Sequence, residues 1–210
     1  MLDHLGQLPS YAAQKFGNRE ALIFENHSFT YNEINLLVEN LASNLKSLGI
    51  KEKDVITLYA SNSWEWIISY FGIARVGAVI NPVNTMLTSE EIKYVVNDCK
   101  AKAIITSSDK VSDIIKLKET GQINFIISFN GAIEGSISFD DLINNKISSI
   151  DMPNVSPKAL STIGYTSGTT GHPKGAMQSH RAVILNGSMT SQMHMRNIND
   201  VVVSALPCPH

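Results

Sequence analysis

The amino-acid sequence predicts an α/β fold with a mostly parallel sheet and flanking helices. Strand-like and helix-like segments alternate along the chain, which is typical of the right-handed βαβ units of doubly wound folds. One strand-like segment, residues 54–60, is an almost continuous apolar run, as expected for a strand that helices cover on both faces. The chain has 210 residues, of which 43% are hydrophobic and 17% charged, enough for one large α/β domain or two small ones.

The first expected elements are a hairpin and an amphipathic helix. Residues 21–24 and 28–31 have strand-like composition on either side of the polar turn 25–27. Thr30 and Glu33 then form a T-x-x-E capping box, and the helix that follows ends at Gly49. Its apolar side chains recur at helical spacing: Ile34, Leu37, Leu41, Leu45 and Leu48.

The middle of the chain continues the alternation of strands and helices. After the strand at 54–60, Asn62 is expected to cap the next helix, with Glu65 three residues further on. That helix is apolar almost all round, so it should lie between two layers, with Trp64 and Trp66 in the core. Further strands are predicted at 78–82, 102–106 and 124–129, and further helices after the Thr88-x-x-Glu91 capping box and near 110–118.

The last third of the chain predicts a connector and a second structural unit. Residues 131–155 mix Gly, Ser, Asn and Pro with one short helical segment, 140–145. We therefore divide the chain into an N-terminal α/β subdomain, residues 1–155, and the start of a second subdomain, residues 156–210. The second subdomain is expected to contain strands at 160–165, 175–178 and 201–206 and a helix at 179–195.

Composition excludes several classes of protein. A formal net charge of -2 without a basic run argues against a nucleic-acid-binding protein. Cys99 and Cys208 have no CxxC partner or metal-ligand spacing, so they indicate reduced thiols and a cytoplasmic location. The most apolar stretch, residues 64–74, contains Glu65, and no transmembrane segment or signal peptide is predicted. Transient contact with a membrane surface and a homodimer are left open.

Residues 165–175, with the sequence YTSGTTGHPKG, form the one motif that indicates chemistry. Glycines let the backbone turn sharply and bring its N–H groups close to an oxyanion, threonine and serine hydroxyls add donors, and Lys174 adds a positive charge. Each hydrogen bond to a charged phosphate oxygen contributes about 1.5–3 kcal/mol. The loop is not a Walker A motif, because Lys174 lies between Pro173 and Gly175 rather than after a glycine. A loop of this composition can also be merely flexible, but the order of its residues favours phosphate binding.

Residues 165–175, followed by AMQSH at 176–180, resemble the phosphate-binding signature of the AMP-binding, adenylate-forming superfamily. Acyl-CoA synthetases, aryl-acid CoA ligases, luciferases and peptide-synthetase adenylation domains belong to that superfamily. Residues 71–84 resemble its FGixraGAvvxPxN segment, and residues 29–33 and 49–54 fit two further segments, with Lys53 in place of the usual glycine. The resemblance covers nearly the whole chain and implies the incomplete N-terminal domain of an adenylate-forming enzyme, most similar to fatty-acid–CoA ligases between residues 72 and 93.

The resemblance implies a ligand set and a role for individual residues. The substrates would be ATP, a carboxylic acid and CoA, with Mg²⁺ as cofactor: the acid attacks the α-phosphate to give acyl-AMP and pyrophosphate, and a thiol then displaces AMP. His210 matches the histidine of an LPxxH segment that lies beside the acid, and we take it as the catalytic-site candidate. His172, His180 and Arg181 are weaker candidates. The residues implied to contact the β- and γ-phosphates are Thr166, Ser167, Gly168, Thr169, Thr170, Gly171 and Lys174.

The resemblance also implies that much of the enzyme lies beyond residue 210. Members of the family are more than twice as long, and their magnesium, ribose and adenylation residues would lie in the later part. We therefore expect residues 1–210 alone to be inactive. Two alternatives stay open: an adenylation domain or luciferase-like protein with a different acceptor, and a non-catalytic nucleotide-binding module.

Overall fold

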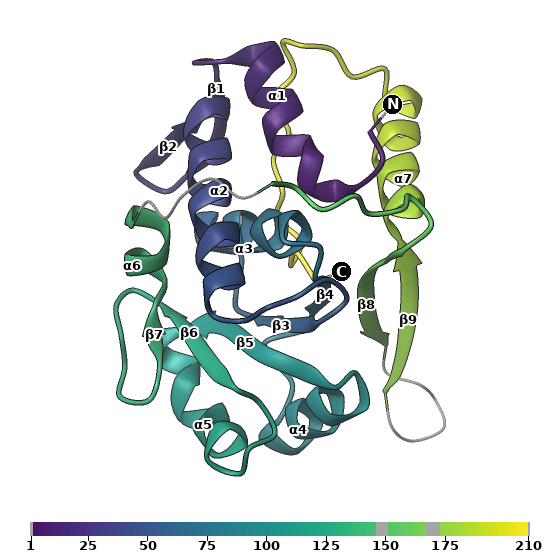
Figure 1. Cartoon of the computed structure of the whole chain (residues 1–210). Helices are drawn as coiled ribbons and strands as arrows, with labels where there is room; N and C mark the ends of the chain where they lie inside the picture. The colour runs from purple at the N-terminus through teal and green to yellow at the C-terminus, as the bar shows by residue number, and fades with distance from the viewer. Residues whose placement is uncertain (1, 146–150, 167–172, 210) are drawn as a thin grey trace.

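The computed structural model describes residues 2–145, 151–166 and 173–209 and has the predicted α/β architecture (Figure 1). Its strands are β1 (Glu20–Phe24), β2 (His27–Thr30), β3 (Val55–Tyr59), β4 (Val79–Pro82), β5 (Ala101–Ser107), β6 (Phe125–Phe129), β7 (Ile137–Ser138), β8 (Leu160–Thr166) and β9 (Lys174–Ser179). Its helices are η1 (Leu5–Gln7), α1 (Leu8–Phe16), α2 (Tyr31–Ser47), α3 (Trp64–Arg75), α4 (Ser89–Asp98), η2 (Ser108–Lys110), α5 (Val111–Glu119), α6 (Phe139–Asn144) and α7 (His180–Met193).

The main sheet has seven strands in the order β7-β6-β5-β3-β4-β8-β9. Neighbouring strands from β7 to β8 are parallel, and only β9 pairs antiparallel, with β8. The chain adds β4 on one side of β3 and then crosses back to add β5 on the other side. Such a reversal of strand order creates a crevice at the carboxyl ends of the strands, where open α/β sheets bind their ligands.

Two apolar cores cover the two faces of this sheet. The first core contains Leu41 of α2 and Ile73 of α3. The second core contains Val95 of α4 and Ile114 of α5, and all four side chains are almost completely buried. Because side chains alternate along a strand, Ile56 faces the first core and Val55 the second. This arrangement explains why β3 reads as a continuous apolar run.

Local capping fixes the helix starts that the sequence predicts. Thr30 accepts a hydrogen bond from the backbone of Glu33 at 3.2 Å, and the Glu33 carboxylate accepts one from the Thr30 N–H at 2.7 Å. Thr88 and Glu91 repeat the pattern at the start of α4. These reciprocal bonds satisfy N–H groups that the first turn of a helix leaves free.

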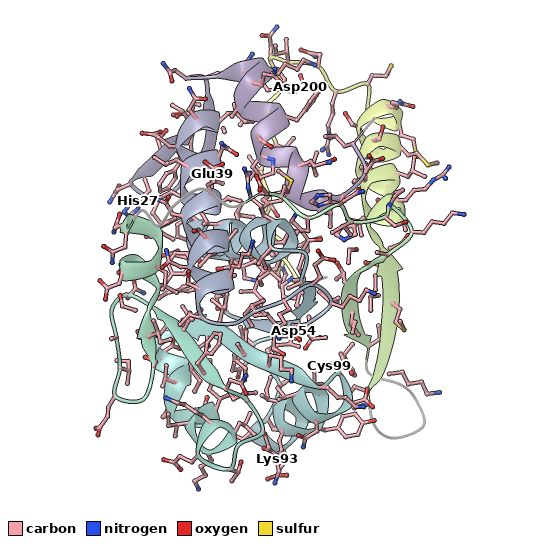
Figure 2. All side chains as sticks on the ribbon, in the orientation of Figure 1. His27, Glu39, Asp54, Lys93, Cys99 and Asp200 are labelled. Atoms are coloured by element: carbon pink, nitrogen blue, oxygen red, sulfur yellow. The ribbon has the colours of Figure 1, made fainter. Side chains whose placement is uncertain are left out.

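Helix α3 lies between α2 and the sheet, as predicted for a helix that is apolar almost all round. Gly72 allows the close approach of α2, because a Cβ atom there would lie 2.7 Å from Leu41 Cδ2. Glu39 of α2, labelled in Figure 2, forms an ion pair of 2.8 Å with Arg75 at the end of α3. Trp66 is buried and Trp64 packs against the same core, as expected for core residues.

Two expectations about elements are wrong. Asn62 does not cap α3: the helix begins at Trp64, so Ser63 is the N-cap and accepts from the Trp66 N–H at 3.2 Å. Residues 201–206 form no strand. Val201 and Val203 are 85% and 87% exposed, and strand propensity alone does not form a strand without a neighbour to pair with.

The other predicted elements occur within a few residues of their expected positions. Within the described ranges, no helix is long and apolar enough to cross a membrane. Strands β8 and β9 extend the same sheet as β3 and β4. The subdomain boundary near residue 155 stays a prediction.

Candidate phosphate-binding site

Strands β8 and β9, at the right of Figure 1, flank the predicted phosphate loop in the sequence. Thr166, the last residue of β8, is paired with Lys174, the first residue of β9. The Cα atoms of such directly opposed residues lie about 4.5–5.5 Å apart. Both residues are exposed, so the structure places Thr166 and Lys174 opposite each other at the solvent-facing ends of β8 and β9.

The remaining predicted site residues lie outside the described part of the chain. They are Ser167, Gly168, Thr169, Thr170 and Gly171 of the loop, and His210. Their roles therefore stay predictions.

Asn81 holds β8 against the parallel sheet. Its side chain is completely buried; Nδ2 donates to the carbonyl of Ile163 at 2.8 Å, and Oδ1 accepts from Thr57 Oγ1 at 2.9 Å. Backbone pairing between β4 and β8 is confined to Ile80 and Thr162 in the described residues. The Asn81 amide therefore supplies a side-chain link to the strand that carries the loop.

Cys99 supports the same contact from α4. It lies between that helix and the β8–β9 hairpin (Figure 2), and its Sγ is 3.6 Å from Asn81 Oδ1. Burial raises the pKa of the Cys99 thiol to about 11, which keeps the thiol protonated and able to donate. We assign Cys99 a structural role.

Tyr165 anchors the hairpin to the same end of α4. Its hydroxyl donates to the Asp98 carboxylate, and burial, followed by this hydrogen bond, raises the pKa of Tyr165. Tyr165 is paired with Gly175, where a Cβ atom would lie 3.2 Å from the ring Cζ and 3.0 Å from Ile163 Cγ2. The glycine therefore leaves room for the tyrosine ring.

His180, the first residue of α7, connects the end of β9 to the N-terminal segment. It is 1% exposed, and its Nδ1 accepts from the Leu5 N–H at 3.2 Å. Its ring contacts the buried His4 ring edge to face, with 5.5 Å between centroids. Burial, and then the nearby His4, lower the pKa of His180 to about 4, so the ring is neutral near pH 7. Sequence reasoning missed this contact because its partner lies 175 residues away.

A second feature lies at the carboxyl edge of the sheet. A small cavity of about 220 Å³ opens beyond the ends of β3 and β4, beside the tail that carries the LPxxH sequence. It is lined by Ala60, Ser61, Asn62, Asn84, Thr85, Ala205, Pro207 and Pro209. Because β8 runs parallel to β4, β8 ends at this same edge, with Thr166 as its last residue. Among the described residues, no three or more His, Cys, Asp or Glu side chains are grouped to hold a metal ion.

Comparison with known proteins agrees with the motif. The family model for AMP-binding enzymes matches residues 10–210. The indoleacetate–CoA ligase of Aromatoleum aromaticum is 29% identical over 99% of this chain and 39% of its own length. The 4-coumarate–CoA ligase 1 of Narcissus pseudonarcissus is 32% identical over 99% of this chain and 40% of its own length.

A solved long-chain-fatty-acid–CoA ligase from Archaeoglobus fulgidus has the same fold, with a TM-score of 0.90 at 24% identity over 99% of this chain and 43% of that protein. The chain spans about two fifths of the length of these relatives, between 39% and 43%. The resemblance read from residues 165–175 is confirmed by the family match over nearly the whole chain. The chain belongs to the AMP-binding enzyme family.

Proposed function

We propose that the full-length protein activates a carboxylic acid with ATP and transfers the acyl group to CoA. The proposal rests on the motif at residues 165–175, in a chain that the AMP-binding family model matches. The strands that flank the motif pair Thr166 with Lys174. The names of its relatives, which are CoA ligases, favour CoA as the acceptor.

The proposed reaction has two balanced steps. A carboxylate oxygen attacks the α-phosphorus of ATP, so acyl-AMP forms and pyrophosphate leaves. The CoA thiol then attacks the acyl carbon, the bond to AMP breaks, and the thiol proton is released with the acyl-CoA and AMP. Donors preorganised around developing charge are the largest catalytic contribution in many enzymes.

The loop is assigned to the outer phosphates and the departing pyrophosphate. Lys174 and the Thr166 hydroxyl would offset negative charge at the base of the loop, and residues 167–171 would add backbone and hydroxyl donors. His210 is assigned to the acid side of the site. Bound Mg²⁺ would neutralise phosphate charge, but none of the described side chains is assigned to hold it.

The acid is proposed to be a fatty acid, on the likeness of residues 72–93 to fatty-acyl ligases. Two relatives instead carry the names of aromatic acids, indoleacetate and 4-coumarate. A panel that contains both kinds of acid is therefore the informative substrate set.

Residues 1–210 on their own are proposed to be inactive, because the loop can hold only the outer phosphates. A cytoplasmic location is proposed from the two free thiols, Cys99 and Cys208. Neither proposal affects the assignment of the loop.

Acid-dependent exchange of labelled pyrophosphate into ATP tests the function. The full-length protein is assayed with fatty acids of several lengths, indoleacetate and 4-coumarate, and thioester formation is measured after CoA is added. We expect exchange that needs an acid and is greatly reduced in Lys174→Ala, and none from residues 1–210. Nucleotide binding without exchange with any acid would instead support a non-catalytic module.

A further inference from the structure

Asn62 is hydrogen-bonded to the tail that carries the LPxxH sequence. Its Nδ2 donates to the carbonyl of Leu206 at 2.8 Å, and its Oδ1 accepts from the N–H of Cys208 at 2.7 Å. The three residues are far apart in sequence, separated by 144 and 146 positions. A residue that sequence patterns place at a helix cap therefore makes two long-range contacts.

The two bonds match the side-chain amide of asparagine. An amide both donates and accepts, whereas an aspartate carboxylate only accepts and would face the Leu206 carbonyl without a proton to offer. The two backbone groups flank Pro207, which has no N–H. The Asn62 amide thus bonds the groups on both sides of the proline and fixes the direction and the rotation of the tail at that point.

Asn62 is well placed to act as a fixed point. It lies in the short connection between β3, whose five residues are all buried, and α3, whose first turn Ser63 caps. These two elements belong to the main apolar core. The backbone of Asn62 is therefore held at both ends by elements of the core.

The tail itself has little else to hold it. Leu206 is 74% exposed, and of the apolar residues between 201 and 208 it is Cys208 that packs against the core. Figure 1 shows the yellow segment running from α7 past α1 and down to β4. Upstream, the carbonyl of Ile198 accepts from the Arg19 guanidinium. The Asn62 bonds therefore determine where the chain lies just before His210.

We propose that Asn62 is a positioning residue for residues 206–209, the described part of the LPxxH segment that is assigned to the acid. By holding the tail across the carboxyl ends of β3 and β4, it shapes the cavity of about 220 Å³ and directs the chain toward the acid. The inference rests on the proposed function for the identity of that ligand. It assigns Asn62 no contact with ATP, since its bonds are to the tail and not to the β8–β9 hairpin.

The test combines hydrogen–deuterium exchange with steady-state kinetics on the full-length protein. In Asn62→Ala, peptides that contain residues 206–208 should exchange faster, while peptides of α2 should not change. The KM for the acid should rise about tenfold, as expected for the loss of two hydrogen bonds of ordinary net strength, while the KM for ATP stays within about twofold. Asn62→Asp, which keeps only the bond from Cys208, should show the same pattern.

Asn97→Ala is the matched control, because Asn97 of α4 is an exposed asparagine outside this cavity, and its side chain makes no hydrogen bond among the described residues. It should leave exchange at the tail as in the wild type. Unchanged deuterium exchange at residues 206–208 in Asn62→Ala would show that the two Asn62 hydrogen bonds do not hold the tail. Faster exchange with an unchanged acid KM, or an equal rise in both KM values, overturns the positioning role. A wild-type protein without acid-dependent activity counts against the proposed function. Deuterium exchange would still show whether Asn62 holds the tail.

Discussion

Lys174 and the threonines of the loop are the residues on which the account of ATP binding depends most. Lys174 is exposed at the base of the loop, so its removal should not affect the core. We expect Lys174→Ala and Thr170→Ala to lower kcat/KM for ATP by about 10- to 100-fold, the equivalent of one lost hydrogen bond to a charged group. Lys158→Ala is the matched control, since Lys158 is an exposed lysine just before the other end of β8. Wild-type kinetics in Lys174→Ala would remove the lysine from the site.

His180 should make stability depend on pH. Its folded pKa of about 4 lies below the ordinary histidine value of 6.5, so the unfolded chain binds more protons between these values. The stabilisation is complete above pH 6.5 and is lost as the pH falls toward 4. Asn at position 180 keeps an acceptor for the Leu5 N–H but cannot titrate.

We therefore expect the thermal midpoint to fall less between pH 7 and pH 5 in His180→Asn than in the wild type. His194→Asn changes an exposed histidine just after α7 and should keep the wild-type dependence. Equal pH dependence in all three proteins would show that burial of His180 does not control its protonation.

The role of a single residue could be predicted only where a motif of neighbouring residues in the sequence indicated it. The order of residues in 165–175 indicated the family, and the family match confirmed that resemblance, while the phosphate-binding roles of the single residues stay predictions. Asn62, Asn81 and His180 act through partners more than 80 positions away, and a single sequence contains no periodicity that reports such contacts.

At the scale of elements, β8 depends on β4 for its place in the sheet. Asn81→Ala would remove the link to Ile163 and leave its carbonyl and the Thr57 hydroxyl without this partner. Loss of such a buried polar contact costs about 1–3 kcal/mol. We expect a lower free energy of unfolding, faster deuterium exchange in β8 and a higher KM for ATP.

Asn84→Ala is the control for this prediction. Asn84 follows the same strand, but its side chain accepts only a local bond, 2.9 Å from the Met86 N–H. It should not change exchange in β8. If Asn81→Ala unfolds no more easily than Asn84→Ala, the side-chain link does not hold the strand.

The elements themselves were largely predictable, since capping boxes and apolar spacing are local signals. Thr30 and Thr88 begin helices where predicted because each bonds to a glutamate three residues away. Residues 201–206 show the limit of such reasoning. Their valines favour a strand, but extended chain becomes a strand only with a paired neighbour, which the local sequence does not specify.

At the scale of the whole molecule, apolar surface gathers on α7 and the segment that follows it. The exposed side chains include Leu185, Met189, Met193, Val201, Val203 and Leu206. Exposed apolar patches of this kind mark contact surfaces. We expect residues 1–210 in isolation to self-associate as concentration rises, as measured by light scattering after size exclusion, and Val201→Asp with Val203→Asp to reduce it. A monomer at every concentration would contradict this.

The fate of a labelled carboxylate oxygen tests most directly whether the protein joins an acid to AMP. Full-length protein is supplied with ATP, CoA and an acid whose carboxylate carries isotopically heavy oxygen, and the products are weighed by mass spectrometry. Attack on the α-phosphorus followed by thiol displacement must leave one heavy oxygen in each AMP and none in pyrophosphate. Heavy oxygen in inorganic phosphate, or AMP without any label, would contradict the account.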